Sequence, residues 1–324
     1  MAEPSTILVV VPDRKTQRVV QRILGATLHR VEIVDAVDQA ERMLAHRVPA
    51  LLVVDGALVA QGAAANLLAA AAERGTAACL TLLTGPGVVE LPRLLQLGAV
   101  TNLLVNPMPV LAEELTITAL KLLRGDLFGL EKYMAWGAQV QEAHMRRSAE
   151  RGLLVEQLSG AVRAFGLGPR VASMAMLVAD ELLSNAVYSA PVDGDGRRYR
   201  RDLARDADTS FEGREVVRLR WACDARYLAI EVADQFGSLG RDTILASLAK
   251  AGARDGMRDD GTGAGMGLVL TYRSCDHLIF NLDPGRRTEV IALIDVRFPA
   301  AERPGPGSSY NVFVARPDPS ASTR

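Results

Sequence analysis

The sequence of 324 residues has few cysteines, almost no net charge and no long apolar run. Its three cysteines, Cys79, Cys223 and Cys275, are widely separated and form no CxxC pair, so they encode neither a disulfide framework nor a zinc site. The 37 basic and 38 acidic residues give a net charge of −1, which excludes a general electrostatic attraction to nucleic acid or to an anionic membrane. The 49% of hydrophobic and 23% of charged residues are typical of a soluble globular protein of two domains.

No segment has the composition of a membrane span or of a signal peptide. The longest apolar stretches are rich in alanine and fall far below the roughly 18 residues that a membrane span needs. The first residues, MAEPSTILVVV, include an acidic residue where a signal peptide is basic, and their apolar run is short. We therefore expect a cytoplasmic protein, because unpaired thiols are stable in that compartment.

The first 123 residues alternate short, branched apolar runs with longer helical patterns. Five strand–helix units of this kind predict a parallel sheet covered by helices, and right-handed crossovers make it a doubly wound domain. Ligands of such folds bind at the carboxyl ends of the strands. The residues at those ends are Pro12-Asp13, Asp55, Thr84 and Asn106-Pro107.

These strand-end positions resemble those of the receiver domain of two-component signalling, in which an aspartate after the third strand accepts a phosphoryl group beside a bound Mg²⁺. The resemblance places Asp55 at the acceptor position, Asp13 at the second position of the acidic pair and Thr84 at the hydroxyl position. Pro12 replaces the first acid, and Asn106 replaces the lysine that would neutralise the phosphoryl oxygens. Because the loss of a carboxylate and a cation weakens metal binding and phosphoryl stabilisation, we expect a pseudo-receiver docking module whose Asp55 stays unmodified.

Residues 124–150 contain few turn signals beyond scattered glycines, and we expect a helical linker there. His144 in this segment lacks the acidic neighbour and downstream proline of a histidine-kinase acceptor, so we interpret it as a surface residue. An apolar stripe then follows at helical spacing, which is typical either of a dimer stalk or of a helix packed on its own domain. The stripe consists of Leu154, Leu158, Val162 and Phe165.

A carboxylate and an amide lie four residues apart in the helical stretch ADELLSNAVYSA at 179–190. Glu181 and Asn185 therefore project from one face of the helix, on a stripe otherwise made of Leu, Val and Met. Burial of these two groups costs free energy unless something polar meets them. A hydrated Mg²⁺ with a nucleotide phosphate would satisfy both, because an amide oxygen is a hard ligand and a carboxylate can orient or deprotonate an attacking group.

Two later segments have the features of a nucleotide site. A strand at 228–232 leads into Asp234 and Gly237, an acid at a strand end followed by a glycine turn. Four glycines at alternate positions then precede an apolar run, and such glycines let the backbone approach phosphates closely while helix-start amides point at the anion. These glycines are Gly261, Gly263, Gly265 and Gly267.

The order of acid–amide helix, strand-end aspartate and glycine-rich lid is similar to the ATPase fold shared by gyrase, the ninety-kilodalton chaperone, histidine kinases and the mismatch-repair ATPases. The resemblance covers about 150 to 298. Within that superfamily the sequence looks most like the anti-sigma-factor serine kinases, because an amphipathic helix at 151–165 leads into the acid–amide helix without an acceptor-histidine domain. The resemblance implies an α/β sandwich with ATP and Mg²⁺ as cofactors.

That resemblance implies a role for each of the residues quoted above. Asn185 would ligate Mg²⁺, Glu181 would be the catalytic base, and Asp234 would bind the adenine amino group. Gly237 would shape the adenine wall, and Thr288, after Gly285-Arg-Arg, stands where the family has a Gly-Thr near the adenine. The phosphates would be held by the glycine-rich segment, at Gly261, Gly263, Gly265 and Gly267. The sequence departs from the commoner Asp-x-Gly-x-Gly at Asp234-Gln-Phe-Gly.

The sequence thus predicts a receiver-like domain at 1–123, a helical linker at 124–150, an ATPase domain at 151–300 and a flexible tail at 301–324, in which 311–314 could add to an edge strand. A mixed-charge stretch at 193–208 is either a solvated loop or a partner-docking insertion.

The implied function is an ATP-dependent protein Ser/Thr kinase of a partner-switching circuit. Its protein partner would be an anti-anti-sigma-like substrate or a sigma-like factor. The alternatives are a non-catalytic ATP-binding adaptor and an atypical histidine-kinase-like regulator. We expect no direct contact with nucleic acid or membrane. The sequence is compatible with a homodimer formed through the linker, and it does not decide the oligomeric state.

Overall fold

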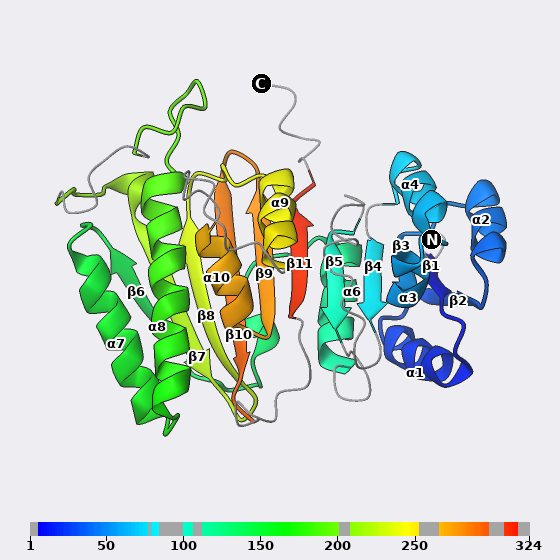
Figure 1. The fold of residues 1–324 in the computed structure, drawn as a ribbon, viewed down its shortest axis with the longest axis horizontal. Coiled ribbons are helices and arrows are strands. Elements are labelled where there is room, and N and C mark those ends of the chain that lie inside the picture. The colour runs from blue at the N-terminus through cyan, green and yellow to red at the C-terminus, as the bar shows by residue number, and fades with distance from the viewer. Residues whose placement is uncertain are drawn as a thin grey trace. The chain divides into compact units, whose positions relative to one another are not determined.

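The structure is a computed structural model of the chain, and it describes residues 6–76, 79–83, 100–105, 112–200, 208–252, 266–297 and 308–316. The chain divides into two compact units. The first consists of Met1–Leu127 with Pro304–Phe313, and the second of Phe128–Arg303 with Val314–Arg324. Each unit combines a sheet with helices (Figure 1).

Branched apolar runs form five parallel strands in the first unit, in the order β2-β1-β3-β4-β5. All five residues of β1 are buried, as expected for a central parallel strand covered on both faces. This strand order is that of flavodoxin-like doubly wound domains, an order that receiver domains share. The structure therefore confirms the predicted parallel α/β architecture of this unit. The strands are β1 (Thr6–Val10), β2 (Arg30–Val34), β3 (Leu51–Asp55), β4 (Cys79–Leu83) and β5 (Asn102–Val105).

The helices of the first unit follow its strands in alternation. Helices α1 and α6 contact each other, and their apolar residues pack on β1, β3 and β5 in one buried cluster that includes Val20, Leu24, Leu115 and Ala119. The described helices are α1 (Arg14–Gly25), α2 (Val37–His46), α3 (Gly56–Ala60), α4 (Ala65–Glu73) and α6 (Ala112–Arg124).

A strand from the C-terminal part of the chain completes the sheet of the first unit. Strand β11 (Ser309–Val314) pairs antiparallel with β5, with Asn311 opposite Asn102. The Asn311 amide donates to Asn102 Oδ1 at 3.0 Å, and Tyr310 and Phe313 are buried. The strand expected at 311–314 thus forms. The expectation of a flexible tail is wrong for this part of it, because its apolar residues enter the core.

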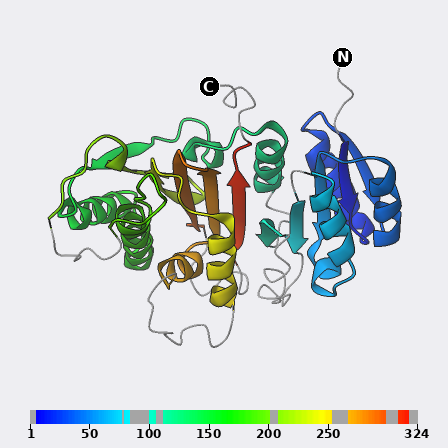
Figure 2. The same ribbon diagram turned by 90° about the horizontal axis from the view of Figure 1, so that it is seen from above.

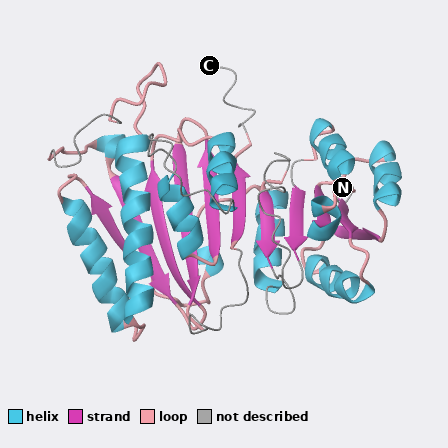
Figure 3. Ribbon diagram, in the orientation of Figure 1, coloured by secondary structure: helices cyan, strands magenta, loops and turns pink. Residues whose placement is uncertain are grey.

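The second unit is built on five antiparallel strands in the order β9-β10-β8-β7-β6. Figure 3 shows these strands in magenta and the helices of the unit in cyan. Their bounds are β6 (Gln141–Met145), β7 (Val217–Cys223), β8 (Tyr227–Asp234), β9 (His277–Asp283) and β10 (Arg287–Asp295).

The helices of the second unit lie together on one face of its sheet (Figure 2). Helix α8 packs against α7, α10 and strand β8, with buried residues such as Val178 and Leu182. The expectation that every apolar stretch is too short for a membrane span is wrong for Pro169–Ser189, which has the length and composition of one. The core helix of a water-soluble protein meets the same two criteria. The helices are α7 (Glu150–Ala164), α8 (Pro169–Ser184), α9 (Arg241–Gly252) and α10 (Met266–Ser274).

The predicted helical linker at 124–150 is wrong. Helix α6 ends at Arg124, and the chain then forms a short 3₁₀ turn, η1 (Leu130–Tyr133), and strand β6. The sequence QEAHM alternates, with Glu142 and His144 exposed and Met145 buried, a period of two that suits a strand with one covered face. The apolar stripe beyond it packs on its own unit, since Leu154, Leu158 and Val162 are buried in α7 beside α8.

Candidate functional site

The acid–amide pair lies where helix α8 changes its geometry. The helix ends at Ser184, and Asn185–Ser189 form a π-helical turn in which the Ala190 amide donates to the Asn185 carbonyl at 2.9 Å. Such turns are rare and occur frequently at functional sites. The side-chain nitrogen of Asn185 is buried and has no hydrogen-bond partner in the described part of the chain, an arrangement that costs free energy unless a further polar group meets it.

Gly267 lies against both of these side chains. It is the second residue of α10, and a Cβ atom on it would be 2.3 Å from Glu181 Oε2 and 3.6 Å from Asn185 Nδ2. Only a glycine leaves the Glu181 carboxylate in this position. The structure thus brings Glu181, Asn185 and Gly267 together at the start of a helix, whose free amides favour an anion.

Asp234 ends strand β8 and is 6% exposed. Its Oδ1 accepts the amide N–H groups of Phe236 at 2.8 Å and of Gly237 at 3.2 Å. Burial raises the pKa of Asp234 by more than these hydrogen bonds lower it. The site therefore contains a carboxylate that is held in place by the turn after β8.

Thr288 lies directly opposite Asp234 on the neighbouring strand β10. Its hydroxyl is buried and makes no hydrogen bond of regular geometry with a described residue, although it is close enough to Asp234 to lower the pKa of that carboxyl. A buried carboxylate and a buried hydroxyl thus form a polar spot in the sheet, near the position that the resemblance gives to the adenine.

Gly237 has a backbone function that the sequence did not reveal. Its φ is +59°, and a Cβ atom would lie 2.2 Å from the Asp283 carbonyl oxygen and 2.6 Å from the Arg286 nitrogen. The Gly285 amide also donates to the Gly237 carbonyl at 3.1 Å. Gly237 is therefore required because the turn after β8 lies directly against the β9–β10 hairpin. Its predicted place in an adenine wall stays a prediction.

Four of the predicted site residues lie outside the described residues. These are Thr84 in the first unit and the glycines Gly261, Gly263 and Gly265 in the second.

The two described acids of the predicted phosphorylation site both cap helices. Asp13 Oδ2 accepts from the amide and hydroxyl of Thr16 at 2.7 and 2.8 Å, and these bonds lower the pKa of Asp13. Asp55 Oδ1 accepts from the Ala57 amide at 2.8 Å, so Asp55 is the N-cap of α3. Val10 pairs with Val54, so both acids follow neighbouring parallel strands at one edge of the sheet. Among the described residues no group of three or more His, Cys, Asp or Glu side chains could hold a metal ion.

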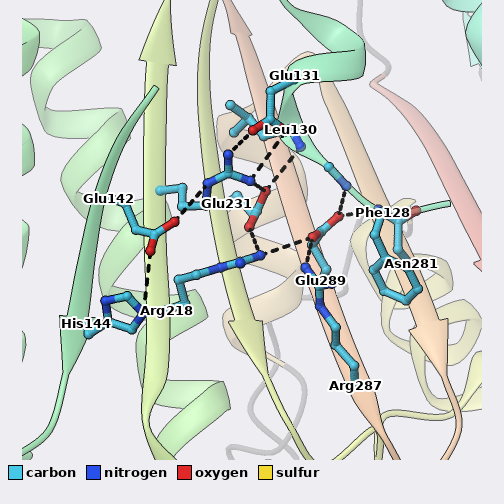
Figure 4. Close-up of polar contacts among 12 residues, drawn as sticks. Phe128, Leu130, Glu131, Glu142, His144, Arg218, Glu231, Asn281, Arg287 and Glu289 are labelled. Carbon is cyan, nitrogen blue, oxygen red and sulfur yellow. Dashed lines mark hydrogen bonds and ion pairs between the residues drawn. The ribbon is translucent and has the colours of Figure 1, made fainter. Parts of the chain in front are cut away.

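The opposite face of the second unit's sheet carries a buried charged network, which sequence reasoning missed (Figure 4). Glu231 on β8 and Glu289 on β10 are both fully buried. Arg218 Nη2 lies 2.8 Å from Glu231 and 3.6 Å from Glu289, and Arg220 Nη1 lies 3.3 Å from Glu231. Burial and the neighbouring Glu289 carboxylate raise the pKa of Glu231.

A sequence signal for this polar face exists. In β7 the residues Val217, Leu219 and Trp221 are buried, and Arg218 and Arg220 alternate with them. Because successive side chains of a strand point to opposite faces, this alternation indicates one apolar and one charged face.

No protein-family model matches the chain, and no curated protein matches it. Among solved structures the chain is similar to NtrX from Brucella abortus in complex with ADP, with 16% identity over 58% of this chain and 36% of that one, and a TM-score of 0.32. It is also similar to the response regulator LqsR of Legionella pneumophila, with 11% identity, coverage of 94% and 92%, and a TM-score of 0.26. The chain thus spans little more than a third of NtrX, and TM-scores this low do not establish a shared fold.

Proposed function

We propose that the second unit binds Mg²⁺-ATP and transfers phosphate to a serine or threonine of a partner protein, in a partner-switching circuit of the anti-sigma type. The first unit would act in it as a pseudo-receiver that modulates this activity. The observation that carries the proposal is the grouping of Glu181, Asn185 and Gly267, which come from α8, the π-helical turn after it and α10. A Cβ atom at Gly267 would meet the side chains of the other two. A sheet with helices on one face, as in this unit, supports the sandwich fold that the sequence resemblance implies.

The residues present fit the proposed cofactor. The Asn185 side chain carries an amide oxygen, which is the hard ligand that a hydrated Mg²⁺ takes. Its buried nitrogen, which has no partner among the described residues, is an N–H donor that a phosphate oxygen would satisfy. The missing Cβ of Gly267 leaves the Glu181 carboxylate beside this amide. Bound Mg²⁺-ATP would supply the phosphoryl group and the cation that shields its charge. The Glu181 carboxylate would take the proton of the incoming hydroxyl. At the sheet, the Asp234 carboxylate would accept a hydrogen bond from the amino group of the base.

Replacement of Glu181 tests the kinase proposal. We expect Glu181→Gln to bind ATP as the parent does, but to lose about 10²- to 10⁴-fold in the rate of phosphate transfer, the contribution typical of a general base. The matched control is Asp180→Asn. Asp180 directly precedes Glu181 in the chain, but it pairs with Arg151 and is not part of the candidate site. The measurement is transfer from labelled ATP to candidate proteins of the anti-anti-sigma type, with ATP affinity measured by calorimetry.

Two results would contradict the proposal in different ways. Full ATP binding without transfer to any candidate would favour the non-catalytic adaptor. If millimolar ATP with Mg²⁺ fails to raise the melting temperature, and Asn185→Asp behaves like the parent, neither nucleotide function holds, because a ligand that binds the folded state stabilises it.

A further inference from the structure

The chain enters the second unit through a short segment that lies on the charged face of its sheet. We call Phe128–Tyr133 the strap. It starts directly after Leu127, where the N-terminal part of the first unit ends, and it includes the 3₁₀ turn η1. Gly129 has a φ of +111°, a conformation that other residues rarely adopt, so the strap has a glycine hinge at its start.

Two buried carboxylates hold the backbone of the strap (Figure 4). The Gly129 amide donates to Glu289 Oε1 at 2.9 Å, and the Leu130 amide donates to Glu231 Oε2 at 3.2 Å. Hydrogen bonds to charged acceptors are stronger than neutral ones. The strap therefore depends on two side chains that belong to β8 and β10.

Side-chain contacts add to these backbone bonds. The guanidinium carbon of Arg287 lies 4.4 Å from the centre of the Phe128 ring, and Glu131 pairs with Arg220. Leu130 is fully buried, and Tyr133 packs edge-on to His277. The strap thus covers the face with one aliphatic and two aromatic side chains, and the rest of the contact is polar.

A polar face makes the strap easier to release than a segment on an apolar core. If the strap leaves, Glu231 keeps its partners Arg218 and Arg220, and Glu289 keeps the Asn281 amide, which donates to it at 2.8 Å. Water would replace the two strap amides at the freed acceptor sites. Release therefore leaves no isolated buried charge, which is the arrangement that would make it costly.

The strands that hold the strap also carry the candidate site. Glu231 and Asp234 lie three residues apart on β8, and Thr288 and Glu289 are neighbours on β10. An odd separation in a strand places side chains on opposite faces. The carboxylates that hold the strap and the polar groups of the candidate site thus share one strand pair, paired in register from Thr288 with Asp234 to Ile291 with Glu231.

We propose that the strap is a releasable regulatory element. When it is bound, Glu231 and Glu289 fix the β8–β10 pair, and with it the turn in which Asp234 receives the Phe236 and Gly237 amides. When it is released by a change in the first unit, that turn loosens. The effect of strap release on ATP affinity rests on the proposed function. The link between the strap and the turn after β8 does not depend on it.

The test is amide hydrogen–deuterium exchange of the full-length protein without nucleotide, in Glu231→Gln, Glu289→Gln and the double variant. We expect the Gly129 and Leu130 amides to exchange about tenfold faster, because each loses a hydrogen bond to a charged acceptor. We also expect faster exchange at Phe236 and Gly237. Glu142→Gln is the control, since Glu142 shares this face and pairs with Arg220 but makes no bond to the strap.

Gly129→Ala disturbs the strap and leaves the sheet unchanged. Its Cβ would lie 3.1 Å from Glu131 Oε2 in a conformation strained for alanine, and we expect the same amides to lose protection. The proposal would be overturned if the strap amides of the double variant exchanged at the parent's rate. It would also be overturned if the turn amides kept their protection while the strap amides lost theirs. In the same variants we expect ATP affinity to change about fivefold or more. A parent that binds no ATP would refute the proposed function, and the exchange comparison would still decide the role of the strap.

Discussion

Two glycines beside the candidate site are required for different reasons. A Cβ on Gly237 would meet three backbone atoms of the β9–β10 hairpin, whereas a Cβ on Gly267 would meet the end of the Glu181 side chain. Backbone atoms cannot move aside without disturbing the hairpin, but a carboxylate can rotate away. Substitution of Gly237 should therefore affect the fold, and substitution of Gly267 should affect the site.

Gly267→Ala tests this distinction. We expect the Glu181 carboxylate to move, and ATP affinity or phosphate transfer to fall at least about tenfold. Stability should not fall, because alanine favours a helix by about 1 kcal/mol over glycine. The control is Gly160→Ala in α7, where a Cβ meets nothing within 4 Å. Thermal unfolding with an ATP titration measures both effects, and equal loss of ATP binding in both variants would contradict the prediction.

The burial of Asp234 gives a pH dependence with a definite sign. Its pKa in the folded protein is raised above the ordinary value of 3.8. Such a group contributes stability below its unfolded pKa and loses this contribution as the pH rises through the folded pKa. We expect the free energy of unfolding of the parent to fall relative to that of Asp234→Asn as the pH rises from below 3.8 towards neutrality, in denaturant unfolding at a series of pH values.

Asp224 provides a comparison of opposite sign. Burial raises the pKa of Asp224, but hydrogen bonds from backbone amides, above all that of Tyr227, lower it by more. The net shift of the pKa is therefore downward. The parent should therefore lose stability relative to Asp224→Asn as the pH falls through the acidic range. The same slope for both variants would show that burial does not dominate at Asp234.

At the scale of elements, β11 adds an antiparallel strand beside β5 in the first unit. Phe313 on this strand is 1% exposed, and Lys121 Nζ lies 4.2 Å from the centre of its ring. The strand thus supplies core side chains to a unit whose other strands all precede residue 106.

Phe313→Ala tests whether β11 is part of the core. We expect a loss of about 3–5 kcal/mol in the free energy of unfolding of the first unit, the usual cost of a large cavity, together with loss of the cation–π contact of the buried Lys121. Val314→Ala is the control, because Val314 is 44% exposed, and it should change stability by about 0.5 kcal/mol or less. Denaturant unfolding measures both, and similar values for the two variants would contradict a core role.

The elements that the sequence predicted correctly have strong local patterns. The strands of the first unit are continuous branched runs, and α7 and α8 have clear helical periodicity. The segment 124–150 was mistaken for helix because five residues of strand β6 are too few to show their alternation against scattered glycines. The grouping of Glu181 with Asn185 could be predicted from their helical spacing. The charged face around Glu231 and Glu289 could not, because it forms only when the three strands β7, β8 and β10 pair.

At the scale of the whole molecule, the first unit has receiver-like topology. Pro12 stands in the place of one acid, and Asp13 and Asp55 each cap a helix. Under the proposed function, a signal that passes through this unit would depend on docking and would reach the second unit through the proposed release of the strap.

We expect Asp55 to stay unmodified when the protein is incubated with a small phosphodonor and Mg²⁺. The reason is that one carboxylate cannot replace the paired acids that hold the metal. Intact-mass measurement checks this, with Asp55→Asn as the control for modification elsewhere. A stable aspartyl-phosphate that is present in the parent and missing from the variant would show that the unit is an active receiver.

The sequence by itself determined the alternation of strands and helices in the first unit, the helical spacing of Glu181 and Asn185, and the acid at the end of β8. These features depend on local periodicity and on residue type. Only the tertiary structure decided that β11 returns to the first unit's sheet, that Gly237 lies against a hairpin, and that the strap lies on two buried glutamates. Each of these is a contact between segments far apart in the chain, and local periodicity contains no information on which distant partner a strand or a turn will meet.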